Sequence, residues 1–227
     1  MPTACPGGRV WEILSRHRMT QRTSSSLRLR AQDLVSTADL GLARRLLATW
    51  DPPTADQERT RDRMLAFVDA HPLDAHERSC LEGHLTASAL VLDAAGERAL
   101  LTFHAKLGKW LQLGGHCDGD ANLAAVALRE AIEESGIEGL VIDPIPVDVD
   151  VHPIPARGEE PGHLHLDTRF LVHAPAGSRE RASAESLELR WFAREELDLT
   201  DTDDSVRSLL AIAFPRADPL PDSARAR

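Results

Sequence analysis

The stretch GGHCDGDANLAAVALREAIEESGI, Gly114–Ile137, decides how this chain folds. Its first part is a glycine-rich loop, and its second part has the periodicity of a helix. Positions i, i+3 and i+4 of a helix share one face, so the side chains of Glu130, Glu133 and Glu134 converge. Leucine, isoleucine and alanine side chains fall on the opposite face and suit a core.

Three carboxylates on one helix face repel one another, and a helix that needed only solubility would more often interleave lysine or arginine among them. Divalent cations above this face would remove the repulsion. Carboxylate oxygens are hard ligands, which suit Mg²⁺ or Mn²⁺. A solvated acidic helix face is the alternative interpretation of the same three residues.

The composition limits the class of protein. The chain has 227 residues, enough for one sizeable domain with an appendage, and 42% of them are hydrophobic, as in soluble globular proteins. No apolar run is long enough to span a bilayer, and the net charge of −10 argues against nucleic acid as a partner. Cys5, Cys80 and Cys117 form neither a zinc pattern nor a disulfide framework, so we expect a cytoplasmic location.

The chain divides by composition into segments of different character. From the N-terminus we expect a disordered tail (1–35), a helical extension (36–81), the main domain (82–215) and a second disordered tail (216–227). The arginine- and serine-rich start of the first tail resembles a transit peptide in composition but lacks an apolar signal region. Met19 is an alternative first residue to Met1.

Local patterns predict the elements of these segments. We expect helices over 36–50, capped by Ser36 or Thr37, over 54–71, over 74–81 and over 203–214. We expect strands or extended segments over 85–93, 98–105, 141–156 and 163–174. Strands, one central helix and a closing helix predict an α/β fold, with helices packed on a mixed sheet.

The loop and helix resemble the Nudix hydrolase family at its defining box. That box reads Gly, five residues, Glu, seven residues, Arg-Glu, an aliphatic, any residue, Glu-Glu, any residue, Gly and an aliphatic. Here Gly115 begins the pattern, Arg129 and the three glutamates follow at the family spacing, and Ile137 ends it. The match covers about a tenth of the chain and is highly specific. It implies a Nudix-type α/β/α sandwich with a mixed sheet, here with an N-terminal helical extension.

The box departs from the family pattern at two positions. Ala121 replaces the upstream glutamate, and Ala131 replaces a larger aliphatic residue. The first change removes a residue that supports the loop and helix in the family. We expect Asp118 and Asp120 to substitute for it in part.

The resemblance assigns roles by position. It implies that Glu130, Glu133 and Glu134 bind the divalent cations and serve catalysis. It implies that Arg129 forms a supporting ion pair with a carboxylate of the box, and that the Gly115 carbonyl adds a ligand. Cations on a diphosphate offset its charge and lower the pKa of a bound water, which a carboxylate can orient or deprotonate.

A second constellation is HLHLDTRF. On a strand, His163, His165, Asp167 and Arg169 share one face. We expect Asp167 or a histidine to complete the metal or base set, and Arg169 to bind phosphate or to form an ion pair. A wet strand face with internal ion pairs is the alternative, and a transition-metal site at the two histidines is a weaker one.

Further candidates lie ahead of the helix. Lys106 and Lys109, the only lysines, precede the loop and are candidates for contact with substrate phosphates. His116, directly after the double glycine, is a candidate substrate contact or a loop-structuring residue. We interpret His84 and Cys80 as structural residues.

The predicted function is divalent-cation-dependent hydrolysis of a nucleoside diphosphate linked to another moiety, by a monomer or homodimer without nucleic-acid or membrane partners. The chain has no tyrosine, so the tyrosine typical of diadenosine-polyphosphate hydrolases is absent, and no signature names the substrate. One alternative is a Nudix-fold module that binds a nucleotide without hydrolysis. Another, an isoprenoid-diphosphate isomerase, needs a reactive cysteine, and Cys117 within the glycine loop is the wrong setting.

Overall fold

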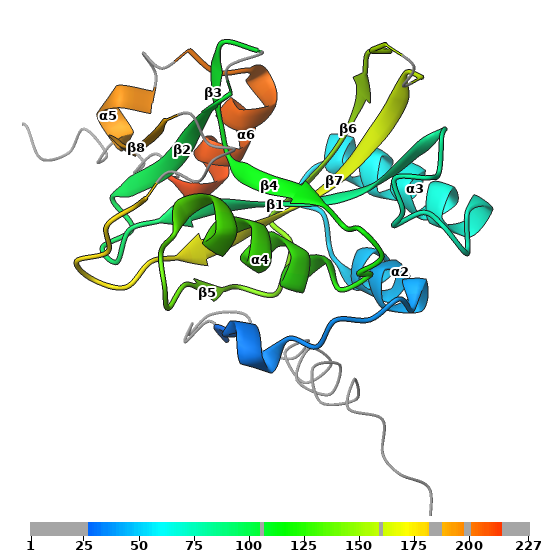
Figure 1. The fold of residues 1–227 in the computed structure, drawn as a ribbon, viewed down its shortest axis with the longest axis horizontal. Coiled ribbons are helices and arrows are strands. Elements are labelled where there is room, and N and C mark those ends of the chain that lie inside the picture. The colour runs from blue at the N-terminus through cyan, green and yellow to red at the C-terminus, as the bar shows by residue number, and fades with distance from the viewer. Residues whose placement is uncertain (1–26, 105–106, 159–160, 182–187, 198–200, 215–227) are drawn as a thin grey trace, which may run out of the picture.

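A long buried strand organises the fold. The computed structural model describes residues 27–104, 107–158, 161–181, 188–197 and 201–214 (Figure 1). Strand β1 (Gly83–Leu92) is buried along its whole length. On one edge it pairs in parallel with β7 (His163–His173), and on the other it pairs antiparallel with β4 (Leu113–His116) and then β2 (Arg98–His104). Mixed pairing of this kind confirms the predicted sheet.

The outer strands extend the sheet on both sides. Next to β7 lie β5 (Val141–Ile142) and β6 (Asp148–Ile154), and next to β2 lie β3 (Lys109–Leu111) and β8 (Leu189–Ala193). The extended segment expected over 141–156 is therefore two strands rather than one. Within the described residues the sheet has eight strands.

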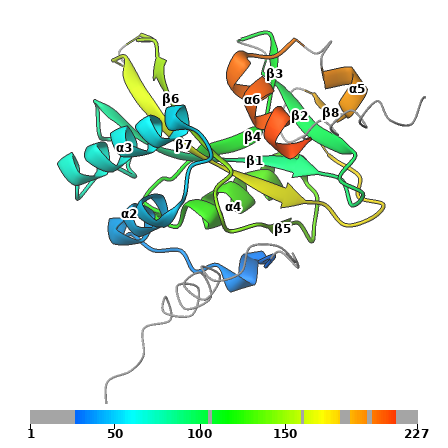
Figure 2. The ribbon, with the colours of Figure 1, turned by 180° about the vertical axis from the view of Figure 1, so that it is seen from behind.

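Helices cover both faces of the sheet. Helix α4 (Leu123–Ser135) packs on the side of β1 that carries Ala87 and Ala89. Helix α6 (Asp204–Ala213) packs on the other side, against Leu90. Figures 1 and 2 show the two helices on opposite sides of β1. This arrangement is the predicted α/β/α layering. A four-residue helix, α5 (Arg194–Leu197), follows β8.

Two N-terminal helices flank the domain. Helix α2 (Leu40–Thr49) is capped by Asp39 rather than by the expected Ser36 or Thr37. Helix α3 (Ala55–Ala70) is capped by Thr54, as predicted, and packs beside β6, where Gln57 donates to Asp148. The prediction of a third helix over 74–81 is wrong, because those residues form successive turns.

Part of the expected N-terminal tail is ordered. Leu29, 6% exposed, exchanges two backbone hydrogen bonds of 2.9 Å with Ile142, and a 3-10 turn, η2 (Ala31–Asp33), follows. The prediction of disorder over 1–35 is therefore wrong for 27–35, because an apolar side chain and a free strand edge stabilise this segment. The rest of that tail, and 216–227, lie outside the described residues.

Candidate active site

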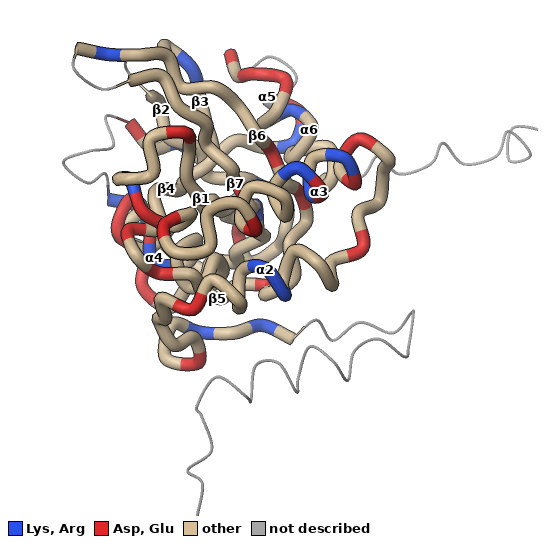
Figure 3. The backbone as a smooth tube through the Cα atoms, turned by 90° about the vertical axis from the view of Figure 1, so that its right-hand side faces the viewer, with Lys and Arg blue, Asp and Glu red and all other residues tan. Residues whose placement is uncertain are grey.

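The box helix is fixed at both ends by local chemistry. Asn122 caps α4 by accepting a hydrogen bond from the Ala125 amide, and Gly136 ends it in the left-handed conformation at φ 62°. Its inward side carries Leu123, Ala124, Val126, Ala127, Leu128, Ala131 and Ser135, all buried. The glutamates of the box therefore lie along the outer side, and Figure 3 shows acidic residues gathered around α4.

Gly115 and Glu130 approach each other closely. Gly115 lies on β4 opposite Ala87, and a Cβ added to Gly115 would overlap the Glu130 carboxylate. A side chain at position 115 would displace the Glu130 carboxylate. Glu130 is half-buried, and burial raises the pKa of its carboxyl, an effect that the Arg129 guanidinium opposes.

Arg129 joins the helix to the glycine loop. Its Nη2 donates to Glu130 Oε1 at 2.8 Å and to the His116 carbonyl at 3.0 Å. The ion pair between Arg129 and a carboxylate of the box is therefore present as predicted. Because the same nitrogen contacts both elements, Arg129 holds α4 against the end of β4.

The residues present fit a divalent cation. Glu133 is exposed and Glu134 is half-buried on the same helix side as Glu130. The Gly115–Glu130 contact brings the backbone of β4 next to the Glu130 carboxylate. An oxygen donor set of this kind suits Mg²⁺ or Mn²⁺ rather than softer metals.

The N-terminal segment occupies the surroundings of Ala121. Ala121 is 0% exposed, and its amide donates to the Thr37 carbonyl at 2.6 Å. Asp120 accepts from the Thr37 amide at 3.1 Å and from the Asn122 amide at 2.9 Å. Asp118 forms a two-point ion pair with Arg78. Both carboxylates hold the loop, as expected of residues that substitute in part for the missing glutamate.

A hollow lies between that segment and α4. Its volume is about 280 Å³. It is lined by Ala31, Leu34, Ser36, Asp120, Ala125, Arg129, Ile132 and Glu133. Five residues of the box stretch thus face a space whose other wall comes from η2 and the residues after it.

Asp167 points away from α4. It shares the sheet face of Thr86 and Ser88, whose hydroxyls donate to its carboxylate at 3.1 and 2.6 Å, whereas Ala87 shares the face of α4. Arg169 Nε donates to the same carboxylate at 3.0 Å. The structure does not bring Asp167 to the carboxylates of the box, so its predicted role as a metal ligand there is not supported.

Arg169 is an ion-pair residue. It is 2% exposed, and its guanidinium contacts Asp148 at 3.1 Å, Asp150 at 3.0 Å and Asp167 at 3.0 Å. Of the two predicted alternatives, the structure contains the ion pairing, in which three carboxylates enclose the cation, whereas substrate binding by Arg169 stays a prediction. The two partners on β6 were missed, although their period-two spacing places them on one strand face.

The remaining candidates lie in different places. His116 ends β4, and its ring lies 5.0 Å from the rings of His84 and His165, between centroids. Lys109 begins β3 and lies opposite His104 of β2, and its contact with substrate phosphate stays a prediction. Lys106 lies outside the described residues.

The imidazoles on this sheet face are electrostatically unusual. Burial, together with neighbouring imidazoles, lowers the pKa of His84 to about 4 and that of His165 to about 3. His152 behaves oppositely, because its hydrogen bond to Asp150 raises its pKa. Sequence reasoning assigned His84 a structural role and missed His152, since only strand pairing brings them to His165.

A family model described as "NUDIX domain" matches residues 83–211, which is more than half of the chain. The chain belongs to the Nudix family. Its mixed sheet between helices is the Nudix fold, and the chain is an enzyme of the class that hydrolyses phosphorus-containing acid anhydrides. Members of this family generally use divalent cations.

Solved structures resemble this Nudix chain at low identity. An Ap4A hydrolase binary complex from C. elegans is 21% identical, with a TM-score of 0.46, over 56% of this chain and 93% of that one. A MutT NUDIX hydrolase from Burkholderia pseudomallei is 22% identical, with a TM-score of 0.45, over 58% and 98%. Similarity at this level says nothing about the substrate of this chain. No curated protein sequence matches it significantly.

The described helices carry one further negative finding. None of them combines the length and the apolar character that crossing a membrane would require.

Proposed function

We propose that this Nudix enzyme is a Mg²⁺-dependent hydrolase, with Mn²⁺ as an alternative, that cleaves the diphosphate bond of a nucleoside diphosphate linked to another moiety. The contact between Gly115 and the Glu130 carboxylate supports the proposal most directly, because it brings the backbone of β4 against a half-buried carboxylate of the box.

The proposed roles follow from position. Glu130, Glu133 and Glu134, with the Gly115 carbonyl, would hold the cations, which supply charge compensation for the diphosphate and a more acidic water. A glutamate of the same set orients that water or accepts its proton. Arg129 positions Glu130 through their 2.8 Å ion pair.

The hollow beside the helix is the proposed place for the group linked to the diphosphate. It adjoins Arg129 and Glu133, so an occupant lies next to the carboxylates. Its other residues include Leu34 and Ile132, which give an apolar contact, whereas Ser36 offers a hydroxyl. A moiety with both an apolar face and hydroxyl groups suits this lining.

The experiment is a panel of nucleoside diphosphate derivatives assayed with Mg²⁺ and with Mn²⁺. We expect release of a nucleoside monophosphate by the wild-type protein. Glu134→Gln should lower kcat by about 10²-fold or more, because it removes a cation ligand and proton acceptor while keeping the side-chain shape.

Glu138→Gln is the matched control, because it makes the same change at an exposed residue just beyond the box. It should keep wild-type kcat. Full activity in Glu134→Gln would contradict the assigned role. Nucleotide binding without cleavage of any diphosphate under either cation would favour the alternative, a Nudix-fold binding module, for which Ala121 is the supporting observation.

Partners and location complete the proposal. The partner is a small nucleotide derivative rather than a nucleic acid, because the net charge is −10. A reducing cytoplasm suits Cys80 and Cys117, which are buried free thiols. The proposed reaction is compatible with a monomer and with a homodimer.

A further inference from the structure

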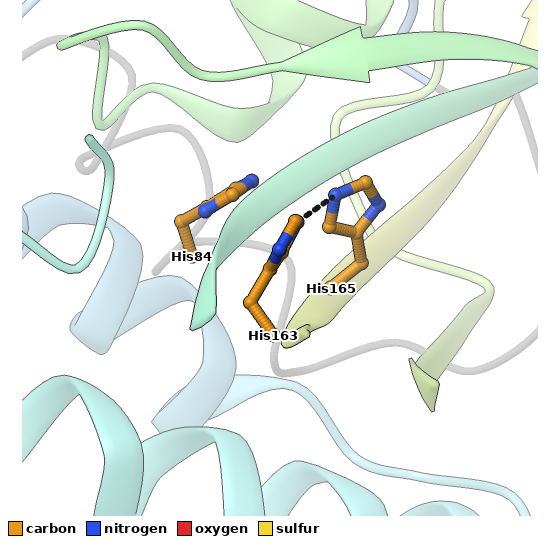
Figure 4. Close-up of side chains that lie close together, drawn as sticks. All are labelled: His84, His163 and His165. Carbon is orange, nitrogen blue, oxygen red and sulfur yellow. Dashed lines mark hydrogen bonds between the residues drawn. The ribbon is translucent and has the colours of Figure 1, made fainter. Parts of the chain in front are cut away.

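Three imidazoles converge at the paired ends of β1 and β7. His84 lies opposite His165 in the parallel register, and His163 begins β7 on the same sheet face. Figure 4 shows the three rings gathered together, His84 from β1 and the other two from β7. One ring nitrogen from each lies within 4.8 Å of those of the other two.

The tautomer of His163 is fixed by the backbone. Its Nδ1 lies 3.1 Å from the Pro161 carbonyl oxygen, which can only accept, so Nδ1 carries the proton. Its Nε2 therefore presents a lone pair, directed at His165 Nε2 at 3.3 Å. A carbonyl that orients the far nitrogen of an imidazole is the arrangement that supports metal-ligating histidines.

His84 is a buried polar ring on the same sheet face. It is 3% exposed, and neither ring nitrogen makes a hydrogen bond of normal geometry to a described residue. Leaving such a buried group unsatisfied destabilises the folded protein. A direct hydrogen bond between His163 and His165 explains those two rings but leaves His84 unexplained. An ion among the three explains all of them.

The separation of the His163 and His165 Nε2 atoms matches the geometry of a tetrahedral zinc site. On a tetrahedral zinc with bonds of about 2.0–2.1 Å, two imidazole nitrogens lie about 3.3–3.4 Å apart. The His163–His165 separation is 3.3 Å.

We infer that His84, His163 and His165 form a site for a divalent transition-metal ion of the zinc type. The fourth position faces water or His116, whose ring lies 5.0 Å from the rings of His84 and His165. Nitrogen donors distinguish this site from the oxygen donors of α4, and they favour Zn²⁺ or Co²⁺ over Mg²⁺. The inference does not depend on the proposed hydrolase reaction.

The described residues contain one other convergent set, His71, Asp74 and Cys80. Its members already satisfy one another, since Cys80 Sγ lies 3.4 Å from His71 Nδ1 and Asp74 lies 3.8 Å from the same nitrogen. That set therefore requires no ion.

The test uses the full chain, stripped with a chelator and dialysed against Zn²⁺ or Co²⁺. A background of Glu130→Gln, Glu133→Gln and Glu134→Gln removes the competing carboxylates of the box. We expect one Zn²⁺ per chain by elemental analysis, and the intense visible absorption of four-coordinate Co²⁺. His165→Asn in that background should weaken Zn²⁺ binding by more than the about 10- to 100-fold that loss of an outer-shell partner costs.

His173→Asn is the matched control, because it lies on the same face of β7 but pairs with Asp143 at 3.1 Å. It should retain the Co²⁺ spectrum. If His165→Asn does not fold, nitrogen NMR of histidine-labelled wild-type protein replaces it, and Zn²⁺ should shift resonances of His84, His163 and His165. Three results would each overturn the inference. They are no bound Zn²⁺ in the background with the glutamates of the box replaced by glutamine, unchanged binding in folded His165→Asn, and unshifted resonances of these three rings.

Discussion

At the residue scale, Gly115 shows how a missing Cβ shapes the box. The sequence places this glycine at the start of the motif, but its local pattern does not show what the glycine contacts. Strand β4 and helix α4 bring it against Glu130, so that a methyl group at 115 would displace the carboxylate. The spacing of the motif is thus the consequence of a contact between two elements.

Gly115→Ala should therefore impair activity more than stability. We expect kcat/KM to fall by about 10- to 100-fold, as for loss of a group that positions a metal ligand, because Glu130 must move. Steady-state kinetics and urea unfolding of the same preparation measure the two effects. Gly96→Ala, at a turn with open space and φ +70°, should cost stability while leaving kinetics unchanged. Equal kinetics in the two variants would contradict the role of Gly115.

At the element scale, the segment from Leu29 to Thr37 explains the unusual residue of the box. This segment bonds to Ile142 at one end and to the amide of Ala121 at the other. A glutamate at 121 would have to fit where Ala121 is fully buried beneath Thr37. The alanine and the docked segment therefore belong together.

Ala121→Glu should loosen this segment. Overpacking and burial of a charge should lower the free energy of unfolding by about 1–3 kcal/mol. Trypsin should also cleave faster after Arg28 and Arg30, which lie at the start of this segment. Ala94→Glu, in an exposed turn, makes the same change and should affect neither measurement. Unchanged cleavage in Ala121→Glu would show that the segment is held without this contact.

At the scale of the whole molecule, one sheet face carries buried polar groups instead of a uniform apolar core. Strands β1, β6 and β7 contribute an Arg169 network with three carboxylates, and beside it the imidazole cluster. Buried titratable groups of this kind make the free energy of unfolding depend on pH, because their pKa values differ between the folded and the unfolded chain.

Stability of the metal-free protein should decrease in acid. The folded-state pKa values of His84 and His165 are about 4 and about 3, below the ordinary value of 6.5. At pH values between the folded-state and the ordinary pKa, the unfolded chain therefore binds more protons than the folded protein does. The free energy of unfolding should therefore fall as pH drops from about 6.5 towards 4. His152, with its raised pKa, opposes this trend in part, because its proton stabilises the fold at low pH and is lost as pH rises.

Urea unfolding at several pH values in this range measures the effect. His165→Asn should show a shallower dependence than the wild type, because one ring no longer has to be protonated inside the protein. His104→Asn, at an exposed histidine, should keep the wild-type slope. A slope unchanged by His165→Asn would contradict the assignment.

The sequence alone determined the features that repeat within a few residues. The period-two row of β7, the helix with three glutamates and the glycine loop all follow from residue type and spacing. These predict the sheet, the box and the oxygen ligands, because each pattern lies within a single element or two adjacent ones.

Only the tertiary structure decided which distant residues meet. The parallel pairing of β1 with β7 places His84 beside His165, and β6 supplies two partners of Arg169. The docking of Thr37 on Ala121 is a contact of the same kind. The physical reason is common to all: strand register and segment docking depend on the packing of the whole core, which no local periodicity contains.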